Sequence, residues 1–246
     1  MRRASVFIGA TLVALAVFAP GRSASAAPAS PSCKSLAHVG DSLTVGAREQ
    51  LTAEYAMRGW SNFRIDAKGG RGIASFMYDD ITGLEAVKRI KATGFNGCWV
   101  MALGTNDTAN ADEFGAPRAA QRAWRLGLIR SMMDELDGAP VVWVNTHLVS
   151  AKASYSAADA VAWNQALLDV VPEYPNMKVF DFNAAASGHP EWTLPDEIHD
   201  TPLGSAHRAD LVARAVTTML RGDVVTSLVR LSVPTSTVRT AFARSA

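Results

Sequence analysis

Four short segments contain the residue types that acyl transfer requires. They are GDSL at 40–43, KGGRG at 68–72, GTND at 104–107 and DEIH at 196–199. A serine hydroxyl is a weak nucleophile until a base removes its proton, and histidine is the side chain whose ordinary pKa lies near neutral pH. Ser42 can be that nucleophile and His199 that base, while Asp196 can orient the imidazole ring. These residues predict a catalytic triad.

The position of Ser42 also allows a structural role. It lies between a strand-like segment, LAHVG, and a helix-like segment that follows it. A serine at such a junction can cap the helix, because its hydroxyl accepts a hydrogen bond from an unpaired backbone N–H. Asp41 could cap the helix equally well, and the local sequence does not decide between the two roles.

The negative oxygen of a tetrahedral intermediate needs N–H donors around it. The backbone amides of Ser42 and Gly70 and the side-chain amide of Asn106 are the candidate oxyanion hole. Gly72 is the alternative to Gly70, and a plain turn is the structural alternative for this glycine cluster. A phosphate-binding loop is not indicated, because the pattern G-x-x-x-x-G-K-[ST] is absent.

Apolar strand-like runs alternate with longer helix-like segments along the chain. The pattern predicts strands at 36–40, 63–67, 98–104, 140–146 and 177–182, and helices at 43–58, 80–93, 117–136, 157–171 and 203–220. Such alternation is typical of an α/β domain with helices on both faces of a parallel sheet. We expect one three-layer, flavodoxin-like domain with five strands in the order 2-1-3-4-5. The first three motifs then follow neighbouring strands at their carboxyl ends, where such sheets bind ligands.

With these motifs in this order, the sequence resembles the SGNH hydrolases, also called GDSL esterases and lipases. The resemblance covers most of the chain after its first residues and rests on all four segments. It implies that Ser42 is the nucleophile, Asp196 the acid and His199 the base, with Gly70 and Asn106 in the oxyanion hole. Gly70 is preferred to Gly72 because some members that act on cell-wall sugars show a similar Gly-Arg pair.

The chain divides into three predicted parts. Residues 1–27 combine two arginines, an apolar run of about a dozen residues and a small-residue cleavage site, which is typical of a secretory signal peptide. The apolar run is shorter than the ~20 residues of a spanning helix, so we expect no stable membrane insertion. Residues 28–222 form the predicted catalytic domain and residues 223–246 a C-terminal extension. We therefore expect a secreted protein, in the extracellular, periplasmic or cell-wall space.

The two cysteines suit an exported protein as a disulfide pair. Cys33 precedes Gly40 by seven residues and Cys98 precedes Gly104 by six, so both are predicted at the starts of their strands. Those strands are neighbours in the order 2-1-3-4-5. The sequence therefore predicts a Cys33–Cys98 disulfide, with two separate buried thiols as the alternative.

Charge and composition narrow the function further. The net charge of +1, without a cluster of basic residues, argues against nucleic-acid binding. The histidines lack the spacing of common zinc sites, so we expect no metal and no cofactor. The sequence predicts a monomeric esterase that removes short acyl groups from carbohydrate. An O-acyltransferase acting on cell-wall polysaccharide with the same site is the nearest alternative, and a catalytically silent carbohydrate-binding module is the other.

Overall fold

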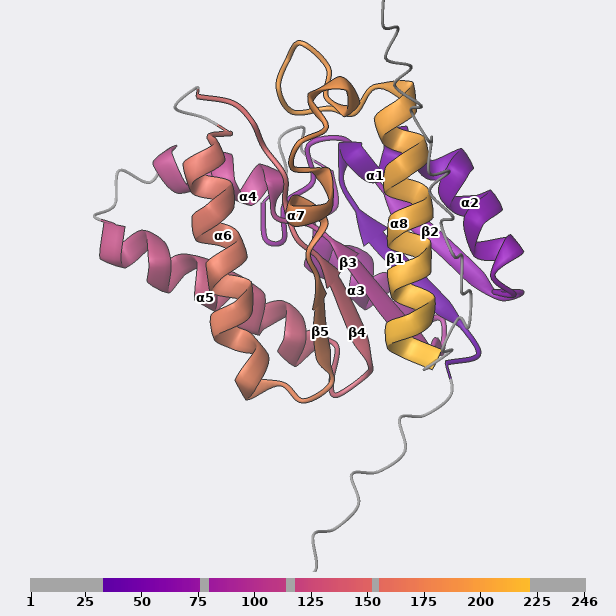
Figure 1. The fold of residues 1–246 in the computed structure, drawn as a ribbon. Coiled ribbons are helices and arrows are strands. Elements are labelled where there is room, and N and C mark those ends of the chain that lie inside the picture. The colour runs from indigo at the N-terminus through magenta and orange to yellow at the C-terminus, as the bar shows by residue number, and fades with distance from the viewer. Residues whose placement is uncertain (1–32, 76–79, 114–117, 152–154, 222–246) are drawn as a thin grey trace, which may run out of the picture. The chain divides into compact units, whose positions relative to one another are not determined.

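A five-stranded parallel sheet forms the centre of the fold (Figure 1). The computed structural model describes residues 33–75, 80–113, 118–151 and 155–221. The strands are β1 (Leu36–Gly40), β2 (Phe63–Ala67), β3 (Cys98–Ala102), β4 (Val141–Val144) and β5 (Met177–Phe180). Their order, β2-β1-β3-β4-β5, is the predicted one. The predicted signal peptide and C-terminal extension lie outside the described residues.

Helices cover both faces of this sheet. One face packs against α2 (Arg48–Met57), α7 (Phe182–Ala186) and α8 (Pro202–Arg221), and the other against α3 (Gly83–Ala92), α5 (Arg118–Glu135) and α6 (Ala157–Val170). Successive strand residues point to opposite faces. Leu36 accordingly packs in the core on the α8 side, and Ala37 and Val39 in the core on the α5 side. No helix in the described part of the chain is long and apolar enough to cross a membrane.

Several predicted boundaries differ from the structure. The helix predicted at 43–58 is two helices, α1 (Ser42–Gly46) and α2, which meet at Ala47. The third, fourth and fifth strands end two residues earlier than predicted. Two helices were not predicted, α4 (Thr105–Glu113) and α7, and neither were the 3₁₀ turns at Val171–Glu173 and Pro190–Trp192. Leu103 and Gly104, which follow the shortened β3, lead into the turn that carries Asn106.

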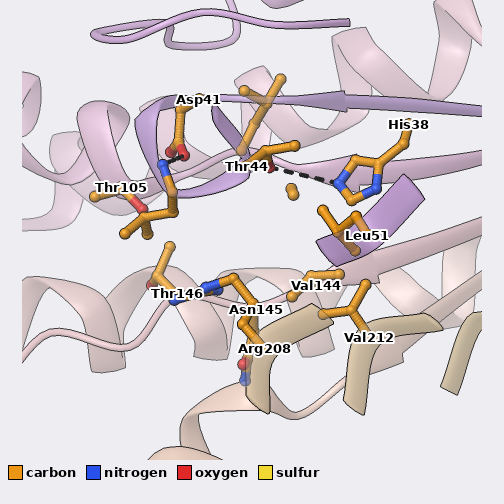
Figure 2. Close-up of a pocket in the computed structure, with 13 residues that line it drawn as sticks. His38, Asp41, Thr44, Leu51, Thr105, Val144, Asn145, Thr146, Arg208 and Val212 are labelled. Carbon is orange, nitrogen blue, oxygen red and sulfur yellow. Dashed lines mark hydrogen bonds between the residues drawn. The ribbon is translucent and has the colours of Figure 1, made fainter. Parts of the chain in front are cut away.

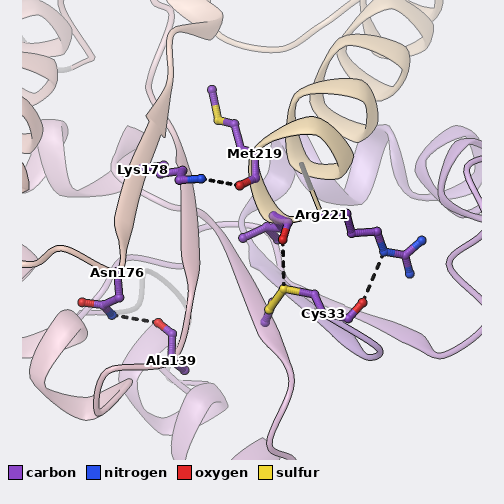
Figure 3. Close-up of a disulfide and its surroundings, with 8 residues drawn as sticks. Cys33, Ala139, Asn176, Lys178, Met219 and Arg221 are labelled. Atoms are coloured by element: carbon purple, nitrogen blue, oxygen red, sulfur yellow. Dashed lines mark hydrogen bonds between the residues drawn. A yellow bond between two sulfur atoms is a disulfide. The ribbon is translucent and has the colours of Figure 1, made fainter. Parts of the chain in front are cut away.

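The predicted disulfide between Cys33 and Cys98 is present (Figure 3). Cys98 is the first residue of β3, and Cys33 precedes β1 by three residues instead of starting it. The two Cα atoms are 5.6 Å apart, and the Nε of Arg221 at the end of α8 donates to the carbonyl oxygen of Cys33 at 3.2 Å. The cross-link therefore joins the amino ends of two neighbouring strands, opposite to the end that holds the candidate site.

Candidate active site

The turn between β1 and α1 presents the hydroxyl of Ser42. Asp41 is the N-cap of α1, since its Oδ1 accepts a hydrogen bond from the backbone N–H of Leu43 at 3.0 Å. Ser42 is the first residue of the helix, and its Oγ lies 3.0 Å from Nε2 of His199. Asp41, and not Ser42, therefore caps α1. The hydroxyl of Ser42 is directed to an imidazole 157 residues further along the chain.

A tight loop before α8 holds the imidazole and the carboxylate together. Oδ2 of Asp196 lies 2.7 Å from Nδ1 of His199, while Oδ1 accepts from the backbone N–H groups of Ile198 at 3.0 Å and His199 at 2.9 Å. Desolvation opposes ionisation of Asp196, but these hydrogen bonds outweigh it and lower its pKa to about 2. The ionised carboxylate can only accept, so Nδ1 of His199 donates to it and Nε2 accepts the proton of Ser42.

An ion pair anchors this loop to α8. Asp200, the residue after His199, faces the guanidinium of Arg208, with Nε to Oδ2 at 2.5 Å and Nη2 to Oδ1 at 3.1 Å. Both side chains are largely buried. A bidentate pair of this kind constrains orientation as well as distance. Sequence analysis missed Arg208, because nothing in its local sequence indicates that it contacts the loop.

The second and third loops, which carry the candidate oxyanion donors, are hydrogen-bonded to each other, and the second loop also lies close to Ser42. An ideal Cβ built on Gly69 would lie 4.0 Å from Cβ of Ser42, so the glycine loop passes close to the serine. Gly70 has a φ of +77°, a conformation that favours glycine. Nδ2 of Asn106 donates to the carbonyl oxygen of Arg71 at 3.0 Å. The N–H of Gly72 donates to the carbonyl oxygen of Ser75 at 2.9 Å and is thereby used within the loop.

The turn from β3 into α4 depends on Gly104 and Asp107. Gly104 has a φ of +137°, and a Cβ there would lie 2.2 Å from Nε1 of Trp163. Oδ1 of the buried Asp107 accepts from the backbone N–H of Ile73 at 2.9 Å. Burial raises the pKa of Asp107 to about 7, against the opposing effect of that hydrogen bond. Asp107 thus ties the glycine loop to the turn that carries Asn106.

No protein-family model matches the sequence, and no curated protein matches it. Solved structures do match. A lipase/acylhydrolase from Enterococcus faecalis has a TM-score of 0.60 at 16% identity, covering 76% of this chain and 97% of that chain. The C-terminal catalytic domain of peptidoglycan O-acetyltransferase A from Streptococcus pneumoniae, with a methylsulfonyl adduct, has a TM-score of 0.58 at 18% identity, covering 77% and 96%. A lipolytic G-D-S-L family protein from Veillonella parvula has a TM-score of 0.55 at 15% identity, covering 76% of this chain and 98% of that chain. The chain has the SGNH hydrolase fold.

Trp192, at the end of the 3₁₀ turn Pro190–Trp192, and His147, three residues after β4, both have structural partners. Trp192 is only 7% exposed, and its ring is stacked between the rings of His189 and His207 at centroid distances of 4.0 and 4.3 Å. Nδ1 of His147 lies 2.8 Å from Oδ1 of Asn183. Among the described residues, the Ser42 hydroxyl is hydrogen-bonded to His199 and to neither of these side chains. Within the described ranges, no group of three or more histidine, cysteine, aspartate or glutamate residues is arranged to hold a metal ion.

A small polar cavity lies beside the turn between β1 and α1 (Figure 2). Its volume is ≈ 20 Å³, and its lining includes His38, Asp41, Thr44 and Arg208 but none of the three candidate triad residues. Burial lowers the pKa of His38 to about 3 and raises that of Asp41 to about 6. The cavity is about the size of one water molecule, so it is no substrate pocket. The candidate triad instead opens to solvent, with the His199 side chain 42% exposed.

Proposed function

We propose that this chain is a secreted serine esterase that cleaves carboxylic esters through an acyl-enzyme. The observation that carries the proposal is the line of hydrogen bonds from Ser42 Oγ to His199 Nε2 and from His199 Nδ1 to Asp196. Such a line turns a serine hydroxyl into a nucleophile, because the base takes its proton during attack. The shared fold supports the proposal, although a fold alone does not establish an activity.

The reaction proceeds in two halves. Ser42 Oγ attacks the ester carbonyl carbon while its proton moves to Nε2 of His199, and the carbonyl oxygen becomes negative. Collapse of this intermediate breaks the bond to the alcohol, which leaves with the proton from His199. A water molecule then attacks the acyl-enzyme and gives a proton to His199. Collapse of this second intermediate breaks the bond to Ser42 Oγ, releases the acid and returns the proton from His199 to the serine oxygen. Asp196 stays ionised throughout and stabilises the imidazolium in both halves.

The negative oxygen is received by the backbone N–H groups of Ser42 and Gly70 and by the side chain of Asn106. Gly70 is preferred to Gly72, because the N–H of Gly72 already donates to Ser75. Asn106 donates one Nδ2 hydrogen to Arg71 and has a second for the substrate. Donors held in place before the reaction need no reorganisation when the charge develops.

Short acyl groups on carbohydrate are the proposed substrates. The candidate triad lies at a surface where the Asp196 and His199 side chains are 45% and 42% exposed, so the alcohol portion of the ester can be a polymer. The disulfide favours an oxidising compartment outside the cytosol, where such polymers occur. The O-acetyltransferase with a similar fold is described as acting on peptidoglycan, which also supports an acylated carbohydrate.

The same similarity favours a second candidate function, an O-acyltransferase. Formation of the acyl-enzyme would be identical, but a sugar hydroxyl would replace water in the second half. The two functions differ only in the acceptor, so they are distinguished by the product formed when a carbohydrate acceptor competes with water.

The test begins with nitrophenyl esters of increasing acyl length, followed by acetylated polysaccharides. We expect release of nitrophenol to be fastest for acetate, with acetate released from a polysaccharide, and no activity in the Ser42→Ala variant. Acyl transfer to an added glycan at the expense of hydrolysis would favour the transferase. Binding of carbohydrate without turnover of any ester would overturn both and favour a binding module.

A further inference from the structure

The Asn106 amide contacts the Tyr155 side chain as well as the backbone carbonyl of Arg71. The hydroxyl of Tyr155 donates to Oδ1 of Asn106 at 3.2 Å, and Nδ2 of Asn106 donates to the carbonyl oxygen of Arg71 at 3.0 Å. Asn106 is only 6% exposed. A flipped amide would bring Oδ1 against the Arg71 carbonyl, which can only accept, and would lose that bond. The Arg71 contact therefore defines which way the amide faces.

The backbone at Tyr155 is strained. Its φ of +62° lies in the left-handed region, which is rare for a large side chain. The flanking structure holds this conformation in place. The N–H of Ala157 donates to the carbonyl oxygen of Ser150 at 2.8 Å, and Ser156 caps α6 by accepting from Asp159. Strain of this kind persists where the surroundings enforce it, and it is concentrated at functional sites.

We infer that Tyr155 is a positioning residue for the oxyanion hole, which rests on the esterase proposed above. The hydroxyl donates into Oδ1 and polarises the amide of Asn106, which makes its remaining N–H a stronger donor. The hydrogen bond from this N–H to the substrate oxygen strengthens as negative charge develops there. It therefore stabilises the transition state more than the bound ester. Tyr155 thus acts on catalysis through Asn106, without contacting the reacting atoms.

A double-mutant cycle tests this inference. Tyr155→Phe retains the ring and removes the hydroxyl. We expect kcat to fall by about 3- to 10-fold, the equivalent of one neutral hydrogen bond, with KM unchanged within about twofold. In a protein that already carries Asn106→Ala, adding Tyr155→Phe should cause no further fall in kcat. Tyr174→Phe is the matched control, because its hydroxyl donates to Asp134 at 2.6 Å on the surface, and it should retain wild-type kcat.

The possible outcomes separate this inference from the esterase proposal. Wild-type kcat in Tyr155→Phe, or an equal loss with and without Asn106, would overturn the positioning role. Ester hydrolysis by a folded Ser42→Ala variant would instead overturn the proposed acyl-enzyme mechanism through Ser42. If Tyr155→Phe folds poorly, Tyr155→Gly replaces it, since glycine accepts the positive φ while removing the same hydrogen bond. A stably folded Tyr155→Gly with wild-type kcat would equally contradict the inference.

Discussion

Replacing both Cys33 and Cys98 with alanine should destabilise the protein without affecting catalysis. The disulfide joins residues 65 positions apart. The chain-entropy relation gives about 4 kcal/mol for a loop of this length. At roughly 2–4 °C per kcal/mol for a domain of this size, the melting temperature should fall by roughly 8–16 °C. Because the cross-link lies at the amino ends of β1 and β3, kcat of the folded variant should stay at the wild-type value.

The assay is urea unfolding of the oxidised wild type, the reduced wild type and the alanine variants. Each single variant, Cys33→Ala or Cys98→Ala, should be about as unstable as the double variant, because either change removes the same cross-link. Reduction of the disulfide in the wild type should lower its unfolding free energy by the same amount. Equal unfolding free energies for the oxidised wild type and the double variant would refute the reasoning, as would two free thiols in a non-reduced digest of exported protein.

Two further substitutions test the site and its surroundings. Asn106→Ala should lower kcat by roughly 10²- to 10³-fold with a smaller change in KM, because its donor acts mainly on the oxyanion; a stable variant with wild-type turnover would remove Asn106 from the site. Burial raises the pKa of Asp41 from 3.8 to about 6 in the folded protein, so the wild type should lose roughly 2 kcal/mol of stability as pH rises from 4 to 6. Asp41→Asn keeps the capping oxygen and lacks this ionisation, so its unfolding free energy should rise relative to wild type over that pH range. If urea titrations gave the same difference in unfolding free energy between variant and wild type at pH 4 and at pH 7, this prediction would be contradicted.

The sheet order and the disulfide could be predicted from sequence because each depends on a regular pattern. Strands and helices alternate along the chain, which limits a parallel sheet to few orders. The register of Cys33 and Cys98 relative to their strands then places them together. The four motifs likewise follow from residue type and spacing, since each lies at a strand end or before the last helix.

The remaining features depend on contacts that have no local pattern. The region at 43–58 has near-helical apolar spacing throughout, yet the backbone breaks at Ala47 between α1 and α2. The first turns of α4 hold Asn106 and Asp107 where an apolar repeat would be expected, so periodicity does not reveal the helix. Tyr155 meets Asn106 across 49 residues, and only the folded chain shows that contact.

The measurement that tests the central claim most directly is covalent labelling by a serine-directed organophosphorus probe, followed by peptide mass spectrometry. The proposed mechanism predicts one modified peptide, with the label on Ser42, and a much slower reaction in His199→Ala because the serine proton then has no acceptor. The folded Ser42→Ala variant should remain unlabelled. Labelling of a different serine, or equal labelling with and without His199, would contradict the claim that Ser42 is an activated nucleophile.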